Sequence, residues 1–527
     1  MALTTNEGAG RSEPAALKPA FGPGGAGAHP GGRRGPDLTT GAIGPTLIAF
    51  ALPVLGTNVL QSLNGSANAI WVSHILGTAA LTATTNANTI FFLMLGSVFG
   101  ITMAANLMIG QAIGAGDQPL AKRIIGTCII FFLGLSSLVG LAGYTFTPAI
   151  LTAMHTPPDA RLDAIIYLRV IFMAIPFMYF FSFIQMAQRG TGDSRTPFYF
   201  SLFAVGLEVC LNPMLIMGIG PFPKLGIAGS ATATLISQTL TLGLIIAWLY
   251  RKDSILVLKR HEWGLLKPDL TIMKNLVTKG LPMGLQMFVI SGAALTMTGM
   301  VNGYGSNTAA AYGGALQLWN YVQMPAMALG MAVSSMAAQN VGAGRMDRVD
   351  RVAGIGAAYA LLFSGVPIAI IYLTQPIVLQ AFLPASSPAF PIAMHINAFT
   401  LWSFIPFGVS FILSGVVRAT GSVTPPLIAM VISLWVIRIP FAVTLQPHIG
   451  ADAIWWAFPV GSISSCLMAG AWFLWGPWRK SRLMDVTPRG AAPDGGHGAP
   501  GGVEETEVAA REAERANPYH AVPVKAE

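Results

Sequence analysis

Charged residues are scarce in this sequence. They make up 10% of its 527 residues, whereas 53% of the residues are hydrophobic. A soluble chain of this length would need far more charge to cover its surface. The composition therefore excludes an ordinary soluble protein and indicates an integral membrane protein.

Cysteine and the signature motifs of catalysis are scarce as well. The three cysteines, Cys128, Cys210 and Cys466, stand far apart inside apolar stretches without CxxC spacing, and we interpret them as buried free thiols. No HExxH or GxSxG pattern occurs, and the "GAGD" and "GAGR" segments lack the GxxxxGK[ST] pattern of a phosphate loop. We therefore predict neither an enzyme nor a metal site, and we expect Gly116 and Gly344 to end helices.

Long apolar runs, in contrast, are abundant. A spanning helix needs about 20 mostly apolar residues, and the chain offers about twelve such stretches between Gly44 and Trp475. Runs such as "IIFFLGLSSLVGLAG" (129–143) are continuous rather than alternating, which favours helices over a transmembrane β-barrel. We predict an all-α integral membrane protein with twelve transmembrane helices.

Basic residues are distributed unevenly among the predicted loops. The odd-numbered loops contain little beyond Arg161 and Lys224. This asymmetry is typical of the positive-inside rule and places both termini in the cytoplasm. The net charge of +8 thus orients the protein in its membrane and does not indicate nucleic-acid binding. The even-numbered loops hold Lys122, Arg123, Arg189, Arg195, Arg251, Lys252, Lys259, Arg260, Lys267, Arg345, Arg348, Arg351 and Arg418.

The two halves of the chain resemble each other. Gln111 matches Gln339 at an offset of 228 residues, and Arg189 matches Arg418 at an offset of 229. The repeat contains six predicted helices, and an even number returns the chain to the same side, so both halves have the same orientation in the membrane. We predict two six-helix lobes related by internal duplication.

The predicted organisation has five parts. Both ends of the chain are rich in Gly, Pro and Ala and contain no apolar run, which is typical of disorder. The parts are a disordered N-terminal cytoplasmic arm (1–41), an N-terminal six-helix lobe (42–250), a cytoplasmic inter-lobe loop (251–275), a C-terminal six-helix lobe (276–476) and a disordered cytoplasmic tail (477–527).

Four segments carry a resemblance to a known family. They are "GQAIGAGDQPLAKR" (110–123), "QRGTGDSRTP" (188–197), "FPKLGIAGSATATLIS" (222–237) and "AQNVGAGRMDRVDR" (338–351). In this order they resemble the MATE (multidrug and toxic compound extrusion) family of transporters, over about residues 42–475.

The resemblance implies a secondary active antiporter that works by alternating access. Such proteins export amphipathic, usually cationic compounds in exchange for protons or sodium ions. The expected partners are therefore small-molecule cations and the lipid bilayer, with no cofactor. We expect a multi-pass monomer in the plasma membrane (the bacterial inner membrane). Because no ATP-binding element occurs, an ion gradient would drive transport.

Glu208 is the only acid expected near the middle of the membrane. A charged group at that depth costs about 2.5–3.5 kcal/mol or more, so it usually faces a wet cavity and marks a functional path. We interpret Glu208 as the group that exchanges a proton for a cationic substrate. The alternative is a structural carboxyl group, hydrogen-bonded to Asn68 or to polar groups of the second or sixth helix.

The family pattern differs from this chain at three positions. Similar family members carry aspartates where Asn68 and Asn212 stand, and an asparagine where Glu208 stands. The expected ion-coupling residues are Glu208, Asn68, Asn212, Asn64 and Ser230. A sodium site normally needs several oxygens, which these residues could supply, but a single titrating group fits protons more simply.

Other candidates lie in the second half of the chain. Polar residues without charge suit a wet substrate chamber. Separately, Pro53, Pro213 and Pro282 interrupt predicted helices and are the expected hinges for the movement of the lobes. Arg438 also falls within a span; it could bind an anion, act as a gate, extend towards the membrane surface, or donate to backbone carbonyls near Pro440. The expected substrate-binding residues are Glu208, Gln286, Asn302, Gln317, Asn320 and His395.

Two other functions are compatible with the sequence. One is a sodium-coupled exporter of the same family. The other is a flippase for a lipid-linked precursor from a related superfamily, which would be expected to place several basic residues in its cleft to bind phosphate. Few basic residues fall in the predicted spans, which favours the exporter.

Overall fold

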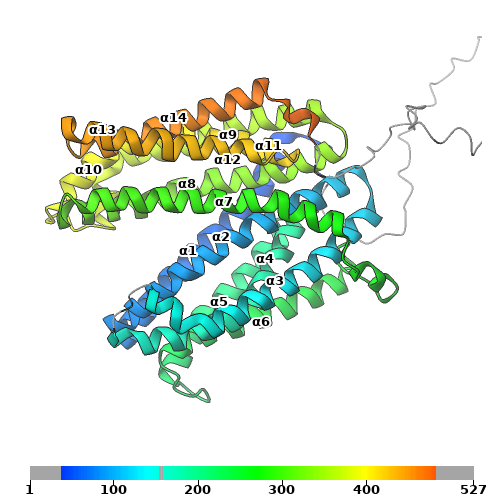
Figure 1. The fold of residues 1–527 in the computed structure, drawn as a ribbon, viewed down its shortest axis with the longest axis horizontal. Coiled ribbons are helices and arrows are strands. Elements are labelled where there is room, and N and C mark those ends of the chain that lie inside the picture. The colour runs from blue at the N-terminus through cyan, green and yellow to red at the C-terminus, as the bar shows by residue number, and fades with distance from the viewer. Residues whose placement is uncertain (1–36, 154–155, 157, 482, 484–527) are drawn as a thin grey trace, which may run out of the picture.

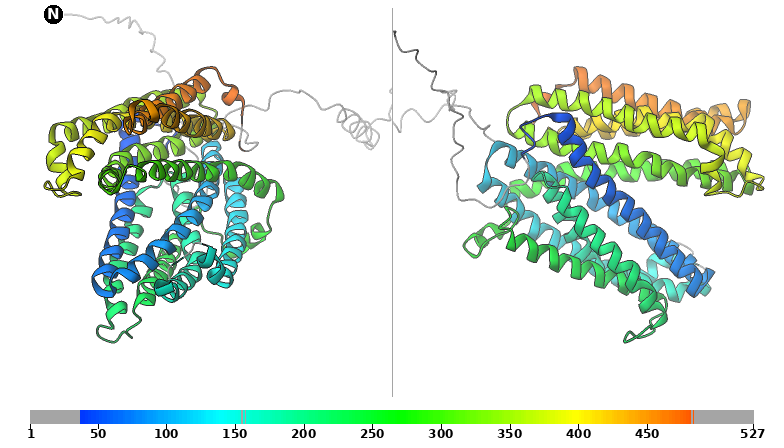
Figure 2. Two further views of the ribbon diagram at one scale, coloured as in Figure 1. Left: turned by 60° about the vertical axis from the view of Figure 1, so that its left-hand side comes forward. Right: turned by 180° about the vertical axis from the view of Figure 1, so that it is seen from behind.

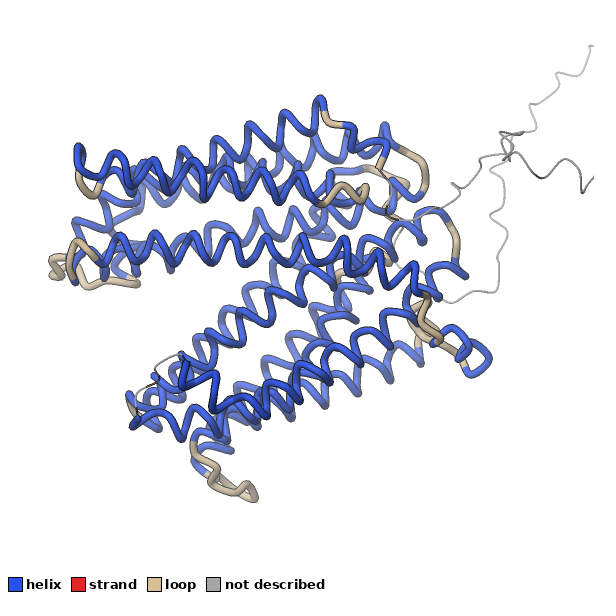
Figure 3. Tube along the Cα trace, in the orientation of Figure 1, coloured by secondary structure: helices blue, strands red, loops and turns tan. Residues whose placement is uncertain are grey.

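The structure is a computed structural model that describes residues 37–153, 156, 158–481 and 483. Within these residues the chain is helical and contains no strand (Figure 3). The predicted all-α fold is therefore confirmed. Most of the predicted arm (1–41) and tail (477–527) lies outside the described residues.

The helices fall into two sets along the chain. The N-lobe contains α1 (Ile43–Leu76), α2 (Thr78–Ala115), α3 (Gln118–Ala153), α4 (Pro158–Gly190), α5 (Arg195–Met217) and α6 (Ile227–Arg251). The 3-10 helix η1 (Arg260–Leu266) follows. The C-lobe contains α7 (Leu270–Asn302), α8 (Ser306–Gly342), α9 (Met346–Gln380), α10 (Ala389–Thr400), the 3-10 helix η2 (Leu401–Ser403), α11 (Phe404–Ala419), α12 (Thr424–Val431), the π-helix η3 (Ile432–Arg438), α13 (Ile439–Ile449), α14 (Asp452–Trp475) and the 3-10 helix η4 (Pro477–Lys480).

These elements form the twelve predicted membrane crossings. Eleven of them in the described part of the chain are long and apolar enough to cross a membrane by length and composition. Two are composite, because α10 continues through η2 into α11, and α12 continues through η3 into α13. The twelfth is α8, which has 37 residues, carries several amide side chains and is largely buried. In lipid, each backbone polar group must be satisfied within the protein, and a helix satisfies them within one segment.

The two lobes meet at one end of the molecule and diverge towards the other (Figure 1). Figure 2 shows the same divergence from behind, with α1 inclined to the helices of the C-lobe. We call the end where the lobes meet the closed end; it carries residues 37–42 and the inter-lobe segment 252–269 (Figure 1). We call the other end the splayed end.

The contacts at the closed end follow the internal duplication. Gln111 Nε2 donates a hydrogen bond to the Ala419 carbonyl (2.7 Å), and its repeat partner Gln339 donates to the Gly190 carbonyl (2.9 Å). Each glutamine thus reaches the last turn of a helix in the opposite lobe. Asn106 and Ser335, which are 229 residues apart, also hydrogen-bond to each other (3.3 Å). The predicted duplication is therefore visible as an approximate two-fold relation between the lobes.

Residues 37–41 form a strap between the lobes. Leu38 is 1% exposed, and its backbone N–H donates to Gln339 Oε1 (3.2 Å) while its carbonyl accepts from Asn340 Nδ2 (3.2 Å). Arg345 donates to the Thr39 carbonyl (2.7 Å). The last residues of the predicted arm are thus bound to the C-lobe, although they precede the first helix of the N-lobe.

The inter-lobe segment makes the corresponding contact with the N-lobe. Lys122 pairs with Glu262, and Arg123 Nη2 lies 3.0 Å from Asp269 Oδ2. Partial burial alone would raise the pKa of Glu262, but hydrogen bonds from Lys122 and the Lys259 backbone hold that pKa below its ordinary value. Asp269 accepts from the Thr271 N–H (2.8 Å) and caps α7, which therefore begins at residue 270 rather than at the predicted boundary of 276.

Candidate functional site

The candidate site begins on one face of α5. Glu208 and Asn212 are four residues apart, so they lie one helical turn apart on the same face. Their side chains are 4% and 2% exposed. The opposite face of α5 is exposed and includes Phe203 and Cys210, so that thiol is not buried as expected. The helix thus turns its polar groups towards the N-lobe interior.

Asn68 of α1 connects three helices. Its Oδ1 accepts hydrogen bonds from Asn212 Nδ2 of α5 (3.1 Å) and from Ser230 Oγ of α6 (2.7 Å). Tyr167 of α4, which is 2% exposed, has its hydroxyl near the polar groups of Asn68 and Ser230. The sequence analysis did not identify Tyr167, because a lone tyrosine in a span gives no signal that distinguishes it from a packing residue.

Glu208 is surrounded by neutral donors. Thr234 Oγ1 of α6 donates to Glu208 Oε1 at 2.6 Å, and Asn64 of α1 lies near the same carboxyl group. None of the ion pairs among the described residues involves Glu208. Thr234 was also missed by the sequence analysis, although it follows Ser230 by one helical turn and so shares its face.

These seven residues form what we call the N-lobe polar cluster. It brings together all five residues expected to couple ions and adds Tyr167 and Thr234. Asn64 and Asn68 are half-buried, whereas the other members are almost fully buried, so the cluster is most accessible along α1. The members are Asn64, Asn68, Tyr167, Glu208, Asn212, Ser230 and Thr234.

The chemistry of the cluster is that of a single acid among amides and hydroxyls. Asn212 Oδ1 is enclosed and receives no hydrogen bond, so it can accept a hydrogen bond from a bound group. Asn68 Oδ1, in contrast, already accepts from two donors. No cluster of three or more His, Cys, Asp or Glu residues that could hold a metal ion occurs in the described part of the chain.

The residues expected to bind substrate in the C-lobe do not form a common site. Gln286 is 6% exposed and accepts from Arg418 Nη1 (3.1 Å). Asn302 lies sixteen residues further along α7, about 24 Å away at 1.5 Å per residue. Gln317 and Asn320 are exposed on α8. His395 Nε2 lies 2.7 Å from Asp452 Oδ1, so this ring nitrogen already has a partner.

The predicted hinge prolines all lie inside helices. Pro53 is in α1, Pro213 in α5 and Pro282 in α7. Each removes one backbone hydrogen bond from its helix. Pro213 directly follows Asn212, so a bend of α5 would begin beside the N-lobe polar cluster.

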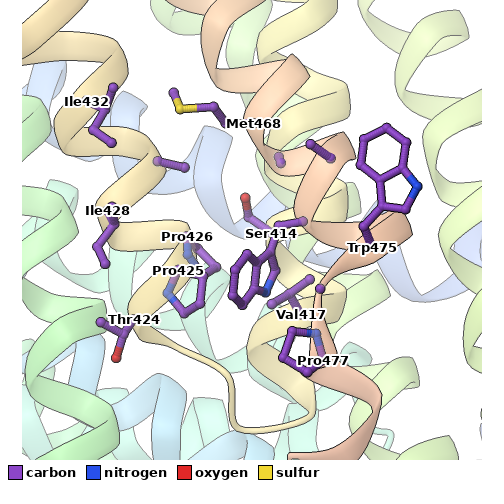
Figure 4. A pocket seen from close by; sticks show the side chains of 15 residues that line it. Ser414, Val417, Thr424, Pro425, Pro426, Ile428, Ile432, Met468, Trp475 and Pro477 are labelled. Carbon is purple, nitrogen blue, oxygen red and sulfur yellow. The ribbon is translucent and has the colours of Figure 1, made fainter.

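An apolar pocket of about 480 Å³ lies elsewhere, at the closed end of the C-lobe (Figure 4). Its walls come from α11, α12 and α14, with Pro425, Met468 and Trp475 among the lining residues. None of the expected site residues lines it. A pocket with so few polar groups suits apolar chains and offers nothing for ion exchange.

Comparisons with known proteins agree with the fold. A family model described as MatE matches residues 53–214 and 282–444. The chain is 34% identical over 436 residues to the probable multidrug resistance protein YoeA of Bacillus subtilis, covering 82% of this chain and 94% of that protein. It is 26% identical over 357 residues to an FAD transporter of Shewanella oneidensis, covering 65% and 77%. A solved structure described as the outward-facing conformation of a multidrug resistance MATE family transporter matches with a TM-score of 0.77 at 21% identity, covering 85% of this chain and 98% of that one.

Proposed function

This chain belongs to the MatE family, and we propose that it is an antiporter that exports amphipathic organic cations in exchange for protons. The name of the Bacillus relative supports export of several compounds rather than one. The protein would work as a monomer, by alternating access between the two lobes. It would need no cofactor.

One observation carries the proposal: Glu208 is buried in a span and has no cation beside it among the described residues. Isolating a carboxylate from water is expensive unless it is neutralised or paired. A proton neutralises it in one state, and a cationic substrate can do so in the other. The two would compete for one negative charge, which is the requirement for obligatory exchange.

The oxygens of the cluster favour a proton over sodium. A sodium ion needs several free oxygen ligands, but Asn68 Oδ1 is occupied by two donors and the Thr234 hydroxyl donates to Glu208. Asn212 Oδ1 is the buried amide oxygen of the cluster that lacks a donor, and Glu208 is its single carboxylate. A single titrating group suits a proton better than a complete sodium shell. Sodium coupling is the alternative that the experiment below distinguishes.

The distribution of charge supports an orientation in the bacterial inner membrane. The basic residues of the even-numbered loops lie at the closed end, together with the strap and η4. The positive-inside rule then makes the closed end cytoplasmic. In this conformation the lobes would be open to the outside, where substrate leaves and protons enter.

Vesicles that contain the protein test this function. With an imposed proton gradient, adding the dye cation ethidium should dissipate the gradient in the wild type, and Glu208→Gln should abolish the effect. Asp347→Asn, which removes an exposed acid of a surface ion pair, should behave like the wild type. An unchanged rate in Glu208→Gln would exclude the proposal, and a response to a sodium gradient alone would establish sodium coupling.

A further inference from the structure

Arg438 is a second charged residue in the membrane interior that the proposed exchange does not use. It ends η3, within the span Thr424–Ile449. It lies fourteen residues from the first residue of that span and eleven from the last, about 21 and 16 Å along a helix. The Arg438 side chain therefore does not easily bring its guanidinium to either membrane surface. Its charge must be satisfied inside the protein.

No acceptor in the described part of the chain satisfies this guanidinium. Arg438 makes no hydrogen bond or ion pair there, and its Nε is enclosed without a partner. Four acids of the C-lobe and of its leading segment are already engaged elsewhere. They pair as Asp269 with Arg123, Asp347 with Arg351, Asp350 with Arg479 and Asp452 with His395.

Aromatic side chains hold the guanidinium in place. Its carbon lies 3.5 Å from the centre of the Phe458 ring, which leaves the N–H groups at the rim free to bind a ligand. The Phe458 ring in turn lies 5.0 Å from that of Trp319 and 6.4 Å from that of Tyr312. Trp319, Tyr312 and Phe458 are 1%, 2% and 7% exposed, so they form a buried aromatic wall.

The backbone around Arg438 is adapted to this position. A Cβ atom added to Gly461 of α14 would lie 3.1 Å from both Cβ and Cδ of Arg438, so the absent side chain makes room for the arginine stem. The π-helix η3 ends at Arg438, and π-helical turns inside α-helices often mark functional sites. The repeat offset of 228–229 residues also places the counterpart of Glu208 at 436–437, next to Arg438.

We propose that Arg438 is an anion-binding site in the C-lobe, which binds a carboxylate or phosphate group on an amphipathic compound. The guanidinium would bind the anionic group, and the buried aromatic wall behind it would keep the guanidinium in position. The cargo would then include zwitterionic and anionic compounds as well as cations. Binding at Arg438 does not require Glu208, so the anion site does not depend on the proposed proton exchange. Only the claim that the bound compound is transported rests on the proposed function.

Binding of the anionic dye carboxyfluorescein to the purified full-length protein, followed by fluorescence polarisation without any ion gradient, tests the site. Arg438→Gln should weaken binding by about tenfold or more, because charge-assisted hydrogen bonds are lost. Arg438→Lys should weaken it by about threefold, because it keeps the charge and loses the planar fork. Ethidium binding should change by less than about twofold, since a cation makes no hydrogen bond to a guanidinium.

Two controls keep the result interpretable. Arg169→Gln removes another half-buried arginine of a span, one that lies over Tyr144 at 5.2 Å, and should leave dye binding unchanged. Glu208→Gln should bind carboxyfluorescein like the wild type, which separates this site from the proposed proton exchange. Should Arg438→Gln not fold, Gly461→Ala displaces the arginine stem without removing its charge and should also weaken dye binding.

Three results would overturn the proposal. Equal dye affinity in the wild type and Arg438→Gln would show that the arginine binds no anion. A wild type that binds no carboxyfluorescein would show the same. Displacement of the dye by phosphatidylglycerol, but not by excess free aromatic carboxylate such as salicylate, would assign the site to a lipid headgroup rather than to cargo.

Discussion

At the scale of single residues, Glu208 is stabilised only by neutral groups. Burying a charge in a span costs about 2.5–3.5 kcal/mol or more, whereas polar contacts within membrane proteins contribute only about 0.6 kcal/mol each on average. The hydrogen bond from Thr234 and the contact with Asn64 therefore do not offset the cost of burying a charged carboxylate at this position. The proposed exchange of proton and cargo would account for its presence.

The hydroxyl of Thr234 donates a hydrogen bond to Glu208, and a substitution can remove that bond. Thr234→Val keeps the shape and removes the 2.6 Å hydrogen bond. Because a polar contact within a membrane contributes about 0.6–2 kcal/mol, we expect the transport rate to fall by about threefold to thirtyfold. Dye export from vesicles measures the transport rate of this variant and of the wild type.

Thr232 provides the matched control for Thr234. Its hydroxyl donates to the Ala228 carbonyl of its own helix at 2.7 Å and makes no hydrogen bond to a residue of the cluster. Thr232→Val should therefore keep its transport rate within about twofold of the wild type, since surface-type substitutions of this kind are nearly neutral. Equal losses in the two variants would show that the Thr234 hydroxyl has no special role.

The residues of the candidate site were predictable where helical spacing and charge agreed. Glu208 and Asn212 share a face by their spacing of four, and the family pattern points to Asn68. Tyr167 and Thr234 were not predictable, because uncharged hydroxyl groups are common in spans. The C-lobe residues were chosen by polarity alone, and polarity does not determine which helix face a residue occupies; Gln286 and His395 consequently have separate partners.

At the scale of helices, α2 and α8 approach each other so closely that only glycine fits. A Cβ added to Gly114 would lie 1.9 Å from the Gln339 carbonyl oxygen, and one added to Gly342 would lie 1.9 Å from that of Gln111. These paired contacts keep the closed end together. They are the places where a single methyl group would push the lobes apart.

We therefore expect Gly114→Ala and Gly342→Ala to destabilise the structure with the closed end sealed. The obstacle is backbone in both cases, so each change should lower the transport rate by about tenfold or more, which corresponds to about 1.4 kcal/mol. Gly134→Ala on α3, where an added Cβ meets nothing within 4 Å, should be neutral or slightly stabilising. If all three variants export dye at the wild-type rate, the closed end is not a rigid contact.

Most helix positions could be predicted from apolar runs, and Gly116 and Gly344 end their helices as expected, with φ of 79° and 72°. The strap could not be predicted, because residues 37–41 are held by a hydrogen bond to Gln339 and by hydrogen bonds from Asn340 and Arg345, and not by a hydrophobic pattern. The residues after α14 are also ordered: Trp478 of η4 is fully buried and donates to the Phe473 carbonyl (2.8 Å). Local order that comes from distant partners has no local signal.

At the scale of the whole molecule, the duplication explains both the shape and the difference between the lobes. The two halves repeat one arrangement, and their matching residues Gln111 and Gln339 make matching contacts across the closed end. The charges differ, however: the N-lobe carries Glu208 and the C-lobe carries Arg438 on the corresponding helix. Under the two proposals made above, a pseudo-symmetric frame would offer one acidic and one basic site for cargo.

Proton release on binding of a cation is the most direct test of this account. Purified protein in a weakly buffered detergent solution with a pH indicator should release protons when ethidium is added, because the dye displaces the proton from Glu208. Glu208→Gln should release none. Ethidium binding to the wild type without proton release, or equal release from Glu208→Gln, would contradict the account.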